Sequence, residues 1–169
     1  PELAQQNAPV NDDFLFNQGQ TRGLGKILFH DYKIAFENYD LPNVNLFQEQ
    51  VAVFKEFLAM ATPDEKQKKD IDFLMAMGEL FALVVYAQLI LENAKIYEMD
   101  DELVDQIFDF MVRDFSKFAL QLYGKPSSTE AQMAYCQRMI KKPVYDKIRY
   151  QKIWQDHVYA LKDVYKMNP

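Results

Sequence analysis

The chain has few residues of the kinds that build metal sites and disulfides. Its 169 residues include one cysteine, Cys136, and two histidines, His30 and His157. A closed structural zinc site needs four such ligands, so a zinc finger within one chain is excluded. One cysteine also excludes a disulfide inside the chain, which is typical of a reducing compartment. We expect no metal site and a cytoplasmic location.

Signals for strands, for membrane spans and for nucleic-acid binding are scarce as well. Glycine occurs five times, proline seven times and threonine three times, and no Asn-Gly or Asp-Gly hairpin turn is present. The longest unbroken apolar run, residues 80–87, is far shorter than the roughly 20 residues of a membrane span. Nineteen basic against 25 acidic residues give a net charge of −6, which disfavours nucleic acid as a partner. We expect no transmembrane segment.

The chain is rich in apolar residues, which make up 49% of it, and aromatic residues alone make up 14%. The length fits one domain with a sizeable core. From about residue 28 the apolar residues recur at helical spacing, whereas residues 1–27 are polar and irregular. We predict an all-α fold: an antiparallel helical bundle of five or six helices over residues 28–169, preceded by an irregular N-terminal arm over residues 1–27.

Prolines and capping patterns give the expected helix boundaries. We expect helices near residues 29–39, 45–62, 63–97, 100–123, 127–142 and from 143 onward. Capping boxes are expected where a small polar residue precedes Glu or Gln by three positions. These pairs are Asn45 with Gln48, Thr62 with Glu65, and Ser127 with Glu130.

The second half of the long third helix, residues 80–91, is apolar almost all round. Such a helix either lies at the centre of a bundle or is covered by a partner. The high content of Tyr, Phe and Met also favours a partner surface, since these residues are enriched at interfaces. We therefore expect a homo-oligomer.

A short glycine-rich segment offers candidate anion contacts at Arg22, Gly23, Gly25 and Lys26. Two glycines let a backbone approach a phosphate closely, and the cations supply charge. The segment lacks the third glycine and preceding strand of a dinucleotide site, and the spacing of a phosphate-binding loop. A flexible turn that enters a helix is therefore the simpler interpretation.

His30 and Glu79 are the two candidate catalytic residues. His30 precedes Asp31, but adjacent residues on a helix do not face each other, so a cap or a neighbouring domain explains His30 as well. Glu79 lies beside apolar residues, which raise the pKa of a carboxyl, although a buried hydrogen bond between helices is the simpler interpretation. Glu92 is expected to pair with Lys95. Cys136 is expected to be unreactive.

Three segments resemble the C-terminal helical extension of bacterial acyl-CoA dehydrogenase-like flavoproteins. They are NQGQTRGLGKILFHD (17–31), MVRDFSKFALQLY (111–123) and VYALKDVYKMNP (158–169). The resemblance implies a parent enzyme that oxidises acyl-CoA thioesters with FAD. No residue of this chain matches the family's catalytic Glu or its FAD-binding motifs, and no strand-rich region is present. The resemblance therefore implies an appended helical domain that binds no cofactor alone.

Three functions follow from these observations. The first is an accessory or interface domain that contacts other domains or subunits of a larger flavoenzyme. The apolar patch Phe14-Leu15-Phe16 then packs on those domains, and the proline at position 1 fits a fragment of a longer protein. The second is a stand-alone binding module for a small apolar ligand near residues 80–91, or for a protein partner. The third is an enzyme that uses His30 or Glu79.

Overall fold

The computed structural model describes residues 31–164, and within them the fold is a bundle of six α-helices without a strand. The first three helices are α2 (Tyr32–Phe36), α3 (Pro42–Met60) and α4 (Ile71–Ile96). The next three are α5 (Asp101–Tyr123), α6 (Glu130–Met139) and α7 (Lys147–Ile153). The predicted all-α bundle of five or six helices is confirmed. His30, Arg22, Gly23, Gly25, Lys26 and the patch at residues 14–16 lie outside the described residues.

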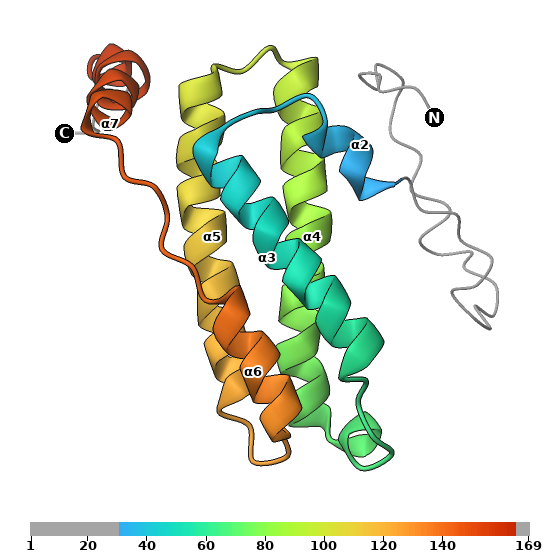
Figure 1. Ribbon diagram of the computed structural model, residues 1–169. Helices are drawn as coiled ribbons and strands as arrows, with labels where there is room; N and C mark the ends of the chain where they lie inside the picture. The colour runs from blue at the N-terminus through green and yellow to red at the C-terminus, as the bar shows by residue number, and fades with distance from the viewer. Residues whose placement is uncertain (1–30, 165–169) are drawn as a thin grey trace, which may run out of the picture.

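Helices α4 and α5 lie side by side with opposite directions, and α3 crosses them (Figure 1). Helix α3 packs against α5 and α6, and α2 packs against α4. Beyond α6 the C-terminal arm, which we define as residues 140–164, runs back along α5 (Figure 1). It ends in α7, a π-helical turn η3 (Trp154–Val158) and a 3-10 turn η4 (Tyr159–Leu161).

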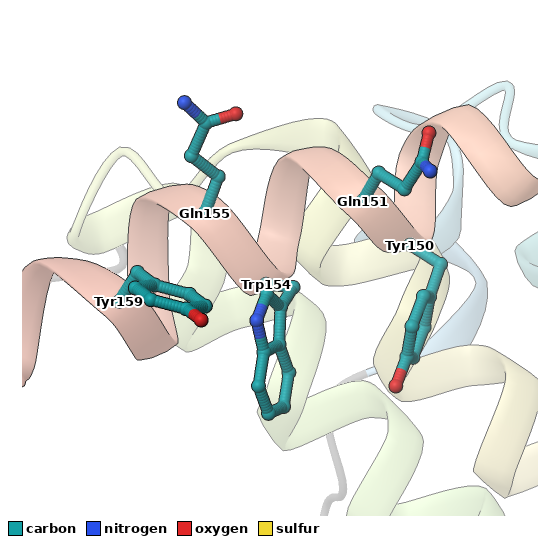
Figure 2. Close-up of a pocket in the computed structure, with 5 residues that line it drawn as sticks. All are labelled: Tyr150, Gln151, Trp154, Gln155 and Tyr159. Atoms are coloured by element: carbon teal, nitrogen blue, oxygen red, sulfur yellow. The ribbon is translucent and has the colours of Figure 1, made fainter.

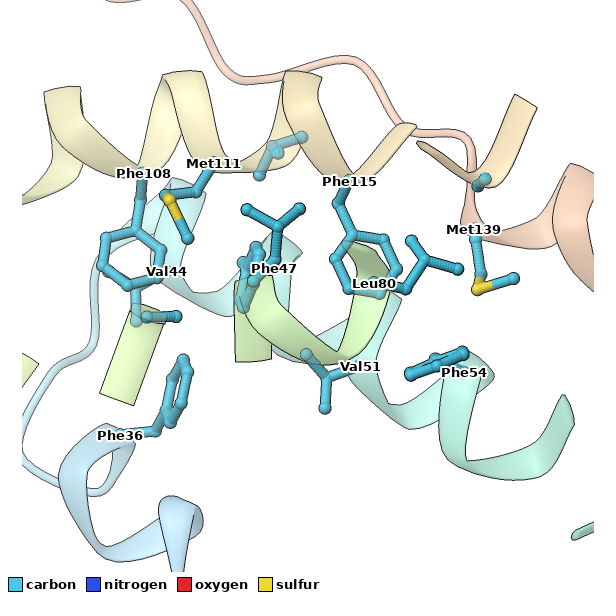
Figure 3. Close-up of a cluster of buried hydrophobic side chains, with 14 of the residues drawn as sticks. Phe36, Val44, Phe47, Val51, Phe54, Leu80, Phe108, Met111, Phe115 and Met139 are labelled. Carbon is cyan, nitrogen blue, oxygen red and sulfur yellow. The ribbon is translucent and has the colours of Figure 1, made fainter. Parts of the chain in front are cut away.

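Phenylalanine side chains form the centre of the core (Figure 3). Phe47 of α3 meets Phe108 and Phe115 of α5 edge to face, with ring centroids 5.5 and 5.4 Å apart. Phe36 of α2 stacks on the same Phe47 ring at 6.2 Å. Edge-to-face aromatic pairs add stabilisation beyond the burial of their area. The core therefore sits where α2, α3 and α5 meet, with Leu80 of α4 fully buried beside it.

Helix α4 begins later than the sequence predicts. A helix over residues 63–97 is wrong, because the side chain of Asp64 accepts the backbone amides of Lys66 and Gln67 in a separate turn. A 3-10 turn, η2 (Gln67–Lys69), follows, and Asp70 then caps α4 by accepting the amide of Phe73. That amide and the hydroxyl of Ser127 hold the pKa of Asp70 below its usual value.

The expected capping boxes are also wrong in detail. Helix α3 begins at Pro42, and Asn45 lies inside it, where its amide donates to Asp40. The hydroxyl of Thr62 donates back to the Leu58 carbonyl and caps nothing ahead of it. The hydroxyl of Ser127 donates to Asp70, and the capping box before α6 forms two residues later, between Thr129 and Gln132.

The last helix starts later than predicted, because a residue far away in the sequence contacts the segment before it. Residues 140–146 are extended, and α7 begins only at Lys147, capped by the side chain of Asp146. The side chain of Asn43 accepts the amide of Val144 at 2.7 Å and donates to its carbonyl at 3.2 Å. Through these two bonds one side chain pairs with both the amide and the carbonyl of Val144, as the backbone of a neighbouring strand would. They therefore hold this segment extended. Helix α2 (Tyr32–Phe36) is shorter than the helix expected near residues 29–39.

Candidate functional site

Helix α4 carries more exposed large apolar side chains than any other α-helix of residues 31–164, and most of them lie along one side. We call this side the outer face of α4 and define it by six residues: Ile71, Met75, Gly78, Ala82, Val85 and Leu89. All six are exposed, and the side chains of Ile71 and Met75 remain 72% and 64% accessible. An α-helix turns about 100° per residue, so the six lie within about 80° of one another. They form one continuous stripe.

The opposite side of α4 is apolar as well and supplies the bundle contacts. Seven residues on that side are buried: Phe73, Ala76, Leu80, Leu83, Ala87, Leu91 and Ala94. They pack toward α5 and α2. A helix in a bundle normally carries charged residues on its solvent side. Helix α4 therefore has two apolar sides, of which the bundle uses one.

The outer face is bordered by aromatic and acidic side chains. Phe81 and Tyr86 flank it and are both about half exposed. Glu79 lies next to Gly78 and is exposed, so the expected buried hydrogen bond of Glu79 is wrong. Asp72 pairs with Lys125 of the α5–α6 connection at 2.6 Å. The border of the outer face thus carries two aromatic side chains, the exposed carboxylate of Glu79 and the Asp72–Lys125 ion pair.

Helix α4 also has the length and apolar composition of a membrane span. It is the one such helix in residues 31–164, and 28% of its most apolar 18-residue window is buried. The core helix of a bundle meets the same criteria, and α4 contributes seven residues to this core. The expected absence of a transmembrane segment stays a prediction.

Within the described part of the chain, the remaining candidate residues have local partners and do not gather into a reaction centre. Glu92 accepts a hydrogen bond from Gln88 at 2.8 Å, whereas Lys95 contacts Asn38, so the expected Glu92–Lys95 pair is wrong. Asp31 caps α2 by accepting the amide of Lys33. Among residues 31–164, no three side chains of His, Cys, Asp and Glu lie together as metal ligands would.

Cys136 lies at the centre of α6 and is fully buried. Burial raises the pKa of its thiol to about 12. The thiolate is the reactive form of cysteine, and it is essentially absent at neutral pH. The burial of Cys136 and the raised pKa of its thiol agree with the expected low reactivity, which stays a prediction.

Besides the bonds of Asn43 to Val144, charged groups hold the C-terminal arm to the bundle. Arg149, which is buried, forms an ion pair with buried Asp105 of α5, and Asp105 also accepts the backbone amide of Asn43 at 2.7 Å. Two exposed contacts follow along α5, from Lys152 to Glu102 and from His157 to Asp100 at 3.3 Å. The His157 contact is an ion pair only when the imidazole is protonated.

The arm also carries an open hollow of about 730 Å³ on its outer side. Tyr150 and Trp154 project from the same side of the arm, and Tyr159 lies near Trp154 (Figure 2). The Trp154 and Tyr159 ring centroids are 5.9 Å apart. A second groove, of about 790 Å³, lies between α2 and α3 and is lined partly by Tyr32, Phe36 and Tyr39.

Neither groove coincides with the ligand site expected near residues 80–91. In that stretch the inward side chains of Leu80 and Leu91 are fully packed in the core, while the outward ones form the outer face of α4. The sequence signal for that face was present in the spacing of its six residues. This signal was hard to recognise because the opposite, buried side of α4 is equally apolar. The apolar residues of this helix therefore do not form one distinct stripe in the sequence.

Comparison of the chain with protein-family models, with curated proteins and with solved structures gives no match.

Proposed function

We propose that this helical bundle is an interface domain of a larger acyl-CoA dehydrogenase-like flavoenzyme and that it joins folded units through the outer face of α4. The observation that carries the interface role is that face: four large apolar side chains lie exposed in line on a helix whose other side is already buried in the bundle. Monomers seldom leave a contiguous apolar surface of this kind uncovered.

The connection to a flavoenzyme rests on the resemblance of residues 17–31, 111–123 and 158–169 to the appended helical domain of that family. Under this proposal FAD and the acyl-CoA thioester are bound by other domains of the parent protein, and this chain contributes contacts. A single, buried cysteine is compatible with a cytoplasmic enzyme.

The native protein tests the flavoenzyme part. The polypeptide is isolated from its source cells with an antibody against this chain, and its intact mass and absorbance spectrum are recorded. We expect a mass several-fold above 19.9 kDa together with flavin absorbance. A native mass near 19.9 kDa without flavin would remove this part of the proposal.

Two matched variants test the interface part. Leu89 lies on the outer face of α4, and Leu120 is a similarly exposed leucine on α5. We expect Leu89→Glu to weaken association of the chain, with itself or with the rest of the native protein, at least tenfold. Leu120→Glu should leave it unchanged. Equal effects of the two substitutions would show that the outer face has no special role.

The second candidate function is a binding module for a small apolar ligand, favoured by the groove between α2 and α3. Ala52 is exposed at this groove, so Ala52→Trp fills it without entering the core. Native mass spectrometry of the purified chain would show a bound small molecule that Ala52→Trp removes. A chain that carries no such molecule argues against this function.

A further inference from the structure

The outer face of α4 has an internal symmetry in its residue numbers. Ile71 and Leu89, Met75 and Val85, and Gly78 and Ala82 each lie equally far from residue 80 along the helix. The successive spacings are 4, 3, 4, 3 and 4 residues, which is the heptad spacing of a helix seam that packs against another helix. The stripe therefore has the pattern of a helix–helix interface, and it reads similarly in both directions.

From this symmetry we propose that the partner of the outer face is a second copy of this chain, with the two α4 helices antiparallel about a two-fold axis at residue 80. The inference rests on the interface role proposed above and names the partner. A two-fold interface uses the same patch on both copies, and each contact occurs twice. Antiparallel pairing places Ile71 opposite Leu89 of the second copy and Met75 opposite Val85 of the second copy. Each layer then contains two large apolar side chains.

Small residues occupy the middle of the face. Gly78 and Ala82 meet across the proposed axis, where two helices would come closest. A Cβ atom built at Gly78 has no neighbour within 4 Å in the chain, so the space beside it is open. The distance between packed helices is set by the side chains at the contact. Gly78 and Ala82 therefore allow a close approach, and the larger side chains fill the layers toward both ends.

The accessible area is sufficient for a dimer. Six side chains, those of Ile71, Met75, Phe81, Val85, Tyr86 and Leu89, are each between 47% and 72% exposed. Each offers on the order of 100 Å², so one copy presents roughly 600 Å² and two copies about 1,200 Å². A specific interface buries about 1,000 Å² or more in total. The outer face together with the flanking Phe81 and Tyr86 meets this requirement at the lower end, which indicates a reversible dimer.

The charges beside the face favour a protein partner over a bilayer. Helices that lie on membranes carry Lys and Arg along the border of their apolar side. Here, within residues 31–164, the charged border residues are Glu79 and Asp72, and Lys125 is present only as the ion-pair partner of Asp72. In the antiparallel pair, Glu79 of one copy lies close to Glu79 of the second copy, because both are one residue from the axis. These like charges weaken the dimer, and neutralising them should strengthen it.

Cross-linking tests the antiparallel register in the full 169-residue chain. Met75→Cys and Val85→Cys are prepared separately, and a short bis-maleimide is added to each alone and to their mixture. The native thiol of Cys136 is buried with its pKa raised to about 12, so it does not compete. We expect a covalent dimer in the mixture only. Self-linking of Met75→Cys alone indicates a parallel pair and overturns the proposal.

Sedimentation equilibrium then tests the residues at the axis. Gly78→Gln should raise the dimer dissociation constant at least tenfold, whereas its urea unfolding should show an intact bundle because the substituted position faces open space. Glu79→Gln should lower the dissociation constant several-fold. The control Leu120→Gln should change neither. A chain that stays monomeric at all concentrations, or variants without effect, would overturn the dimer.

The outcome separates the two proposals. If Leu89→Glu disrupts the native assembly but the cross-link pattern is absent, the interface role stands and the partner is a different unit. If both fail, the outer face has neither role.

Discussion

Helix α4 and the C-terminal arm are attached to the same bundle by opposite kinds of interaction. Helix α4 contributes seven buried apolar residues and no buried charge. The only buried residue of α7 is Arg149, and the arm is held by the contacts of Asn43, Asp105 and Arg149 together with exposed ion pairs. Apolar contacts are non-directional and spread over many residues, whereas the polar attachment depends on a few groups with defined geometry.

This difference indicates which substitutions each region tolerates. Removing one partner of a buried ion pair leaves the other charge buried and unpaired. A single substitution in the attachment of the arm should therefore cause a large loss of unfolding free energy. Along α4 the loss depends on which side of the helix a residue occupies. The four predictions that follow test these statements, beginning with the largest expected change.

Asp105→Ala should cause the largest loss, about 3–5 kcal/mol of unfolding free energy. The substitution leaves the guanidinium of Arg149 buried without its partner and removes the acceptor of the Asn43 amide. Urea unfolding followed by circular dichroism measures it. Glu102→Ala, three residues earlier on α5, breaks the exposed pair with Lys152 and should cost only a small fraction of that loss. Equal losses would show that burial of the pair does not matter.

Leu80→Ala should cost about 2–5 kcal/mol, because Leu80 is fully buried in the core. Leu89→Ala on the outer face of α4 should change the unfolding free energy by no more than about 0.5 kcal/mol at concentrations where the chain is monomeric. The same urea measurement applies to both. If Leu89→Ala costs as much as Leu80→Ala, the outer face is covered within one chain, and the contrast between the two sides of α4 is wrong.

A high salt concentration should loosen the C-terminal arm but not α4. The expected effect is smaller than those of the substitutions above. Screening weakens the exposed contacts of Lys152 and His157, which help to hold the arm. Hydrogen exchange in 0.05 M and 1 M NaCl, values that bracket a Debye length of about 10 Å, should show faster exchange of α7 amides at high salt, by about two- to fivefold. Amides of α4 should exchange at the same rate in both. Unchanged exchange in α7 would mean that the exposed contacts of Lys152 and His157 do not help to hold the arm.

The smallest expected effect is a gain in unfolding free energy from a substitution just after the C-terminal end of α4. Glu98 has φ of 50°, and the amide of Met99 donates to the Ala94 carbonyl, which is the pattern of a helix that ends in a left-handed residue. A left-handed residue with a side chain costs about 1–2 kcal/mol, and glycine loses about 0.5–1 kcal/mol in entropy. Glu98→Gly should therefore raise the unfolding free energy by about 0.5 kcal/mol. Glu98→Ala should give no such gain.

The sequence predicted the packed side of the bundle well. The apolar residues that recur at helical spacing in α5 are buried at Val104, Phe108, Phe115 and Leu122. Those of α3 are buried at Phe47, Val51 and Phe54. These predictions succeeded because an apolar stripe at a spacing of three and four residues must face a core, whatever the neighbouring helices are.

The connections were predicted poorly because they depend on distant residues. Nothing near Val144 in the sequence indicates that Asn43, 101 residues earlier, holds it extended. Ser127 has the sequence context of a cap, but Asp70 engages its hydroxyl. The outer face of α4 lies between these cases. The sequence indicated a helix that is either central or covered, and the fold shows that one side is central and the other exposed.

The position of Cys136 provides a way to time the opening of one helix. Its thiol is enclosed between α6 and the rest of the core, so a thiol reagent in solution reaches it only after α6 has separated. When closing is faster than modification, the modification rate is proportional to the population of the opened state. The single cysteine of this chain is therefore a natural reporter of local unfolding. It allows the free energy of opening α6 to be compared with that of global unfolding in the unaltered protein.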